Sequence, residues 1–311
     1  MGHHHHGHHG HSHHHGATGK ILIASLAVTL LFVATEAVAG WWAGSLALLS
    51  DAGHNFTDAF GLLLAATAYS FESRPGDAVK TFGYQRTGVL AAFVNALMLV
   101  VISVFLIWES VQRLRAPEPV NSQVMLIVAA IGLVVNLGIA WGVGGHGKDL
   151  NLRAAYLHQI GDAASCVGII VGALVIRSTG WLAVDPILSI VMSVFIIWTA
   201  WDIFKDSLNI LLEGLPKGLN LAEVMSEIRG VSRVVDVHDL HIWSLGSEAS
   251  ALSCHVVIED MPTSESELIL ADVNRVLVER FHIHHATIQF EHTRCAAADV
   301  CVGAGMVRDV H

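Results

Sequence analysis

The chain has 311 residues, of which 53% are hydrophobic and 14% are charged, and its net charge is −10 when its 21 histidines are counted as neutral. This composition argues against an ordinary soluble protein and favours an integral membrane protein. The four cysteines show no CxxC pair and no framework spacing, which argues against a disulfide-stabilised domain and suggests a reducing compartment for the soluble part of the chain.

The first 16 residues, MGHHHHGHHGHSHHHG, contain ten histidines. An expression tag is one interpretation, but a tag is normally an unbroken run, whereas glycine and serine interrupt this tract. The alternative is a native segment, residues 1–16, that lies in the cytoplasm. Such a flexible segment would bind metal weakly and raise its local concentration at the entrance of the protein.

Six apolar runs fill the first two thirds of the sequence, and each is about long enough to cross a hydrocarbon core of roughly 30 Å. They lie at residues 21–40, 45–70, 87–113, 122–145, 155–177 and 185–211. The sequence thus predicts an α-helical membrane protein in which residues 17–213 form six transmembrane helices. Lys and Arg are enriched in the connections on the side of the chain termini, which predicts that both termini are cytoplasmic.

The second and fifth runs each carry an HxxxD motif at a similar depth. His54 and Asp58 lie four residues apart and therefore on one helix face, and His158 with Asp162 repeats this arrangement. An ionisable side chain at the centre of a span costs about 2.5–3.5 kcal/mol, so such residues are usually paired or functional. If the two helices pack together, two imidazoles and two carboxylates meet, a donor set that suits tetrahedral Zn²⁺.

A single motif of this kind can also occur where no metal binds. An isolated histidine or aspartate in a span can satisfy a hydrogen bond between helices. HxxxD also occurs in acyltransferases, where the histidine is a general base and the aspartate orients it. Two copies on two predicted spans favour a metal site over both of these roles.

Three further polar residues lie in or beside the predicted spans. Asp51, one turn before His54, is a candidate fifth ligand, proton-relay group or interfacial hydrogen-bond acceptor, and we favour the last two roles. Glu36 in the first span and Asn136 in the fourth either line the same path or link helices.

The sequence becomes polar and mixed from about Leu215, which predicts a small soluble domain over residues 214–293 and a tail over residues 294–311. Helices are predicted near 219–229 and 264–281, and strands near 233–243, 250–259 and 285–291, so the domain is expected to be α/β, with one small sheet backed by helices. Its candidate metal ligands, each of which could equally be an ordinary surface residue, are His238, His241, His255, His282, His284, His285, Glu291, His292 and Cys295.

The chain resembles the cation diffusion facilitator family, whose members export zinc and related divalent metals. The matching segments are SLALLSDAGHNFTDAFGLLLA, NLRAAYLHQIGDAASCVGIIVGAL, RPGDAVKTFGYQR and VHDLHIWSLGSEASALSCHV, and the likeness covers residues 17–293. The resemblance implies a homodimer in a cell membrane, here a bacterial inner membrane. Its cytoplasmic domains, residues 214–293, would have a metallochaperone-like fold and serve metal binding and dimerisation.

The resemblance also implies particular ligands. The transport site would be carried by the residues that the spacing selects, His54, Asp58, His158 and Asp162. Family members with this donor set usually prefer zinc and often accept cadmium or cobalt. In the cytoplasmic domain the resemblance favours three residues that would bind zinc as a regulatory ligand, His238 and His255 first and Glu291 third.

One departure from the family concerns the connection between the second and third spans. Many relatives carry a histidine there, near a second metal site, whereas this sequence has Gln85 in FGYQR. Asp77 is then the one obvious ligand in the connection. We expect no full metal site in this loop.

The predicted function is efflux of a divalent cation, with Zn²⁺ ahead of Cd²⁺ or Co²⁺, by proton-coupled alternating access. The expected partners are the lipid bilayer, the metal ions, protons as the counter-ion and a second copy of the chain, with no nucleic acid. A membrane zinc sensor, a channel and a metalloenzyme are the alternatives. The sequence has no HExxH motif and no buried Ser or Cys beside a base, so an enzyme is not expected.

Overall fold

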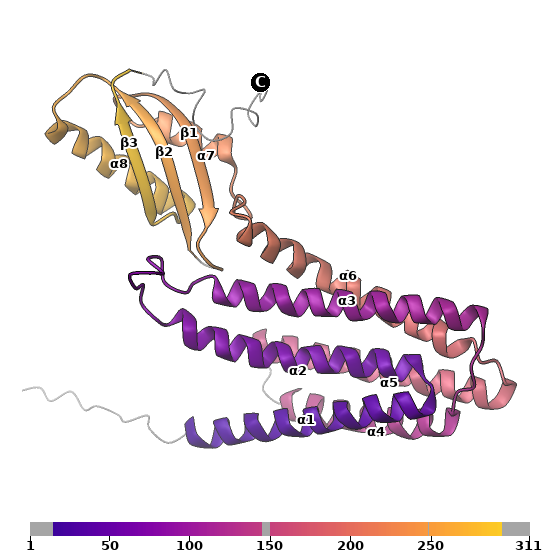
Figure 1. Ribbon diagram of the computed structural model, residues 1–311. Coiled ribbons are helices and arrows are strands. Elements are labelled where there is room, and N and C mark those ends of the chain that lie inside the picture. Colours follow the sequence, from indigo (N-terminus) through magenta and orange to yellow (C-terminus); the bar gives the residue numbers. More distant parts are fainter. Residues whose placement is uncertain (1–14, 145–149, 248, 294–311) are drawn as a thin grey trace, which may run out of the picture. The chain divides into compact units, whose positions relative to one another are not determined.

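The computed structural model describes residues 15–144, 150–247 and 249–293 (Figure 1). Six long helices come first, and their bounds are α1 (His15–Ala43), α2 (Leu46–Glu72), α3 (Thr87–Arg115), α4 (Ser122–Gly144), α5 (Leu150–Thr179) and α6 (Val184–Leu211). The remaining elements are α7 (Leu221–Arg229), β1 (Val234–Ser244), β2 (Ser250–Ile258), α8 (Thr263–Phe281) and β3 (His285–Glu291). Every predicted span and every predicted element of the C-terminal part corresponds to one of these.

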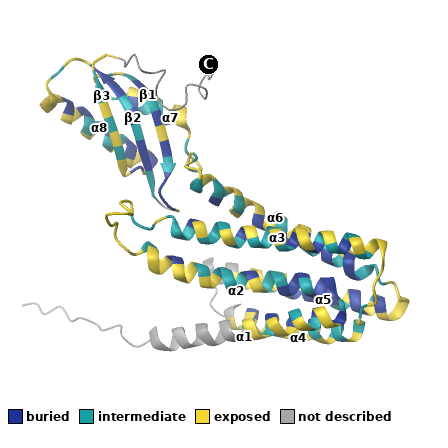
Figure 2. Ribbon diagram, in the orientation of Figure 1, coloured by how far each residue is buried: buried dark blue, intermediate teal, exposed yellow. Residues whose placement is uncertain are grey.

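Four helices, α3 to α6, are long and apolar enough to cross a membrane. The part of α1 whose side chains are described includes a shorter apolar stretch of helix, Thr29–Ala43. Helix α2 carries Asp51, His54 and Asp58, which lower its hydropathy. Exposed residues recur along these helices (Figure 2). Large apolar residues are among them, such as Phe105 and Trp198, as expected where lipid is the solvent.

The chain divides into two compact units, residues 1–63 with 95–201 and residues 64–94 with 202–311. In the first unit α4 packs along α5, and α1 contacts α4. Buried apolar residues of α2, α4 and α5 form a core in this unit, with Leu48, Met125, Ala129, Ile169 and Ala173 among its members. This core holds α2 beside α5, the two helices that carry the HxxxD motifs.

The start of α2 is fixed by polar contacts. Gly44 has a φ of 66°, a conformation that suits glycine in the tight turn from α1. Ser45 caps α2, since its Oγ accepts a hydrogen bond from the Leu48 N–H over 3.2 Å. Asp185, at the beginning of α6, accepts hydrogen bonds from Ser45 Oγ over 2.5 Å and from the Leu46 N–H over 2.7 Å. The buried Asp185 carboxylate of α6 therefore anchors the first turn of α2, the helix that carries His54.

The second unit contains a three-stranded sheet in the order β1-β2-β3, in which β1 and β2 are antiparallel and β2 and β3 are parallel. The core of this sheet includes Val237 and Leu252 on the strands, Val224 on α7, and Val273 and Leu277 on α8. Because both helices contribute to the same core, they back the sheet as the sequence predicts (Figure 1).

Candidate metal centres

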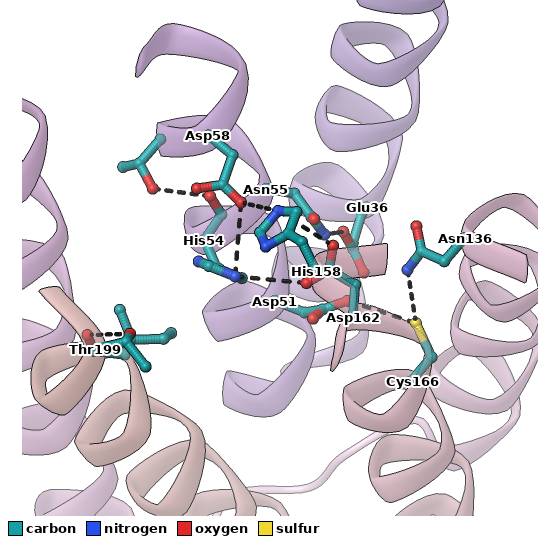
Figure 3. A network of polar contacts seen from close by, with 12 residues as sticks. Glu36, Asp51, His54, Asn55, Asp58, Asn136, His158, Asp162, Cys166 and Thr199 are labelled. Atoms are coloured by element: carbon teal, nitrogen blue, oxygen red, sulfur yellow. Dashed lines mark hydrogen bonds and ion pairs between the residues drawn. The ribbon is translucent and has the colours of Figure 1, made fainter. Parts of the chain in front are cut away.

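The two HxxxD motifs meet in the first compact unit, where α2 and α5 bring four side chains together (Figure 3). His54 Nε2 lies 3.6 Å from Asp58 Oδ2 and 3.5 Å from Asp162 Oδ1. His158 Nε2 lies 3.0 Å from Asp58 Oδ2 and 3.6 Å from Asp162 Oδ2. Each imidazole therefore faces both carboxylates.

The chemistry of these donors fits a divalent cation. His54, His158 and Asp162 each offer a ligand atom within 4.8 Å of the others, and Asp58 contacts both histidines. His54 Nδ1 and Asp58 Oδ2 are buried and lack an aligned hydrogen bond within the described part of the chain. Asp162 is 5% exposed, whereas the His158 side chain is 45% exposed. Two nitrogen and two oxygen donors at this spacing could replace the hydration shell of Zn²⁺.

A buried polar cluster adjoins this group on the side of the α2 N-terminus (Figure 3). Asn55 Nδ2 donates to Glu36 Oε2 over 3.4 Å, and Cys166 Sγ donates to Asp51 Oδ2 over 3.8 Å. Asn136 Nδ2 in turn donates to Cys166 Sγ over 3.7 Å. Asp51 is 1% exposed, so its carboxylate faces the interior of the helix bundle.

Asn55 and Cys166 were not predicted as neighbours of the site. Cys166 follows Asp162 by one helical turn, so its position in the sequence carries the same helical spacing as the HxxxD motif. Helical spacing from Asp162 is therefore the signal that would identify Cys166. Asn55 directly follows His54, but adjacency does not predict which helix its side chain faces.

A second candidate centre lies on the sheet of the second unit. His238 on β1 pairs in register with His255 on β2, and Glu291 ends β3. Glu291 Oε2 lies 3.3 Å from His238 Nε2, and Glu291 Oε1 lies 3.0 Å from His255 Nδ1. His238 Nε2 and His255 Nδ1 are buried without an aligned hydrogen bond among the described residues. These three side chains could hold one cation through two nitrogens and an oxygen.

Asp239 adjoins the second centre and was not predicted from the sequence. The pairing of β1 with β2 shifts register between His238 and His241, and Asp239 within that shift has a φ of 51°. Its carboxylate lies 3.0 Å from His241 Nε2 and 3.9 Å from His255 Nε2. Asp239 therefore pairs with His241 and lies beyond hydrogen-bonding distance from the His255 nitrogen that faces away from Glu291.

The remaining predicted ligands of the C-terminal part are not brought into this centre. The His241 side chain is 55% exposed and contacts Asp239. Four further histidines are exposed, namely His282, His284, His285 and His292. Cys295 and the rest of the tail, like the histidine tract up to His14, lie outside the described residues.

Asp77 is engaged within its own loop. Its carboxylate accepts hydrogen bonds from the Val79 and Lys80 N–H groups, each over 2.7 Å, and from Tyr84 Oη over 3.0 Å. The Lys80 and Val79 donors hold the pKa of Asp77 below its usual value, and the contact with this carboxylate raises the pKa of Tyr84. Asp77 therefore has a structural role in shaping the loop.

Two family models match the chain. The model of the cation efflux transmembrane domain matches residues 22–212, and that of the cation efflux protein, cytoplasmic domain, matches residues 216–293. Together they span the six helices and the sheet.

Individual proteins are similar over most of the chain. Zinc transporter ZitB of Escherichia coli is 39% identical over 311 residues, which cover 99% of this chain and 98% of that protein. The cadmium, cobalt and zinc/H(+)-K(+) antiporter of Bacillus subtilis is 41% identical over 295 residues, 94% of this chain and 92% of that protein.

Among solved structures, the metal-bound C-terminal domain of the CzcD transporter from Cuprividus metallidurans is 41% identical, with a TM-score of 0.22. The match covers 24% of this chain and 99% of the chain in that structure.

The family models and the full-length relatives together identify the kind of protein. The chain belongs to the cation efflux family, the cation diffusion facilitators, and is a multi-pass membrane transporter, not an enzyme.

Proposed function

We propose that the chain exports divalent cations from the cytoplasm, Zn²⁺ foremost and Cd²⁺ or Co²⁺ as further substrates, and that His54, Asp58, His158 and Asp162 hold the ion. The observation that carries the proposal is the convergence of two imidazoles and two carboxylates from α2 and α5. The names of the similar proteins support the choice of metals, since they include a zinc transporter and a cadmium, cobalt and zinc antiporter.

The donor set balances the charge of its cargo. With neutral imidazoles, the two aspartates carry two negative charges, which a divalent cation neutralises inside an apolar span. Once the ion leaves, those charges remain buried unless protons take its place. Metal binding requires deprotonated ligands, so protons and metal compete for the same groups.

Energetics favour coupling of the export to protons. Moving a doubly charged ion outward against a negative interior costs about 4.6 kcal/mol per 100 mV, at roughly 2.3 kcal/mol per charge. One proton moving inward returns about half of that amount. We therefore infer antiport by alternating access, in which the helices expose the four ligands to one side of the membrane and then to the other.

Each part of the chain has a place in this transport cycle. Residues 1–16 gather metal, residues 17–213 carry it across a bacterial inner membrane, residues 214–293 bind metal and dimerise, and both termini are cytoplasmic. His238, His255 and Glu291 bind zinc as a regulatory ligand in a homodimer. Their short contacts with one another support this role, because a bound ion would draw β1, β2 and β3 together.

The proposal is tested in cells that lack their own zinc exporters. Cells producing the intact chain should release preloaded radioactive zinc, and cells producing Asp162→Ala at the same membrane level should retain it. The matched control is Asp202→Ala, which removes a largely exposed carboxylate of α6. If cells with the intact chain and cells with Asp162→Ala release zinc equally, the proposed site does not lie on the transport path. If both retain their zinc, the chain is a zinc sensor and not a carrier.

A further inference from the structure

Glu36 and Asp51 form a buried pair that the metal ligands do not include. Glu36 comes from α1 and Asp51 from α2, and their side chains are 0% and 1% exposed. Their carboxyl groups lie next to each other (Figure 3). Figure 3 shows them beside the four proposed ligands, on the side of the α2 N-terminus.

The surroundings of the pair provide no compensating cation by direct contact among the residues that the structure describes. Glu36 accepts a hydrogen bond from Asn55, and Asp51 accepts one from Cys166. Glu36 Oε1 and Asp51 Oδ1 are buried and have no other hydrogen-bond partner within the described ranges. Two adjoining carboxylates cannot both stay ionised at low cost in such a place, whereas one shared proton removes a charge and supplies the missing donor.

The pair also lies close enough to the proposed metal ligands to respond to a charge among them. The titratable groups that face it are Asp162 and Cys166 on α5 and His54 on α2, while α4 contributes the uncharged amide of Asn136. A doubly charged ion among the four ligands would lie about one helical turn from Asp51 and would favour two negative charges on the pair. Arrival of the ion would then release the shared proton, and return of the proton would weaken retention of the ion.

We propose that Glu36 and Asp51 together form a proton-binding site, separate from the metal ligands, that carries one of the protons exchanged for the metal ion. This inference rests on the proposed function. The pair lies toward the N-terminus of α2 and the C-terminal half of α5, and so toward the membrane side away from the chain termini.

The test measures zinc and proton movement together in proteoliposomes of the full chain, with a zinc dye and a pH dye inside. Glu36→Gln keeps the shape of the side chain and places an amide donor opposite Asp51, which imitates the protonated pair permanently. Zinc should still move down its own gradient, while the number of protons moved per zinc ion should fall by about one. Accumulation of zinc driven by a pH gradient should weaken accordingly.

Asp51→Asn places the amide on the other partner and should have the same effect. Glu109→Gln is the matched control, because Glu109 lies in α3 and pairs with Arg113, and it should keep the proton count of the intact chain. An unchanged proton count in both Glu36→Gln and Asp51→Asn would overturn the proposal. So would loss of downhill zinc flux in both folded variants, because the pair would then serve passage of the ion.

Different results would overturn the proposal for the transport site and the proposal for the carboxyl pair. Zinc flux that persists in Asp162→Ala would overturn the proposed transport site, whatever Glu36 does. Suppose instead that zinc flux requires Asp162 while Glu36→Gln and Asp51→Asn still move as many protons per zinc ion as the intact chain. That result would overturn only the proposal for the carboxyl pair.

Discussion

The Nε2 atom of His158 lies 3.0 Å from Oδ2 of Asp58, so the histidine of one HxxxD motif meets the aspartate of the other. The reciprocal contact, between His54 and Asp162, measures 3.5 Å. The two motifs are thus interleaved across α2 and α5. Each helix supplies one nitrogen and one oxygen donor, and a relative movement of the two helices would separate the donors of α2 from those of α5.

Removing one imidazole should weaken metal binding at the membrane site strongly. His158→Ala leaves three donors, and loss of even a supporting partner of a metal ligand typically costs about 10–100-fold in affinity. We expect zinc to reach half-maximal flux in proteoliposomes at a concentration at least about tenfold higher. Gln159→Ala, a neighbouring change on the same helix, serves as the control, and an equal effect of both substitutions would point to disruption of α5.

Exchanging the histidines for aspartates should change the metal preference. The double variant His54→Asp with His158→Asp presents four carboxylates, and oxygen donors suit Mn²⁺ better than Zn²⁺. Competition between the two metals during uptake should therefore shift toward Mn²⁺. A double variant that retains the zinc preference of the intact chain would show that the imidazoles do not select the metal.

The centre on the sheet should stabilise its domain when zinc binds. A ligand present at about 100 times its dissociation constant stabilises the folded state by about 2.7 kcal/mol. Hydrogen exchange of β1, β2 and β3 in the full chain should therefore slow when zinc is added, and Glu291→Ala should abolish this effect. His284→Ala, an exposed residue outside the centre, should leave it intact. Zinc protection that survives in Glu291→Ala would place the bound ion elsewhere.

Removing the anchor at the start of α2 should destabilise the helix bundle. Asp185 accepts hydrogen bonds from Ser45 Oγ and from the Leu46 and Ala47 N–H groups, and hydrogen bonds to charged groups contribute about 1.5–3 kcal/mol each. Asp185→Ala should lower the unfolding temperature of the detergent-solubilised protein clearly. Asp202→Ala should change it little, because the Asp202 side chain is 79% exposed. Equal unfolding temperatures for the two variants would refute the role of Asp185.

Cys254 should resist alkylation in the folded protein. Burial in the core of the sheet raises the pKa of its thiol to about 12, because a thiolate would be poorly solvated there. Near neutral pH the reactive thiolate is therefore scarce and covered. In a chain carrying Cys295→Ser and Cys301→Ser, mass spectrometry should find Cys254 unmodified by maleimide until denaturant is added. Rapid labelling without denaturant would contradict the burial of β2.

The element order could be predicted from the sequence because its signals are local. Long apolar runs predict spans, and short alternating runs bounded by Gly and Pro predict strands. The predicted start of the fifth span, residue 155, falls later than the observed start of α5 at Leu150, because polar residues such as Arg153 extend the helix beyond its apolar part. Hydropathy detects the apolar part of a helix and misses a polar end.

The transport ligands could also be predicted, because each motif carries its own helical spacing. Contacts between residues that are remote in the sequence could not be predicted in this way. Glu36 and Asp51 lie on different helices, and only the packing of α1 against its neighbours decides that their carboxyl groups lie near each other (Figure 3). The bulge at Asp239 is equally hidden, because VHDLH follows an ordinary strand pattern and the positive φ arises from pairing with β2.

Zinc uptake into proteoliposomes under an imposed pH gradient, compared between the intact chain and Asp162→Ala, would decide whether this site carries proton-coupled transport. We predict zinc accumulation that follows the size and direction of the gradient in the intact chain and is absent in the variant. Zinc binding without gradient-driven uptake in the intact chain would contradict proton-coupled transport, and undiminished uptake by Asp162→Ala would contradict the role of the four intramembrane ligands.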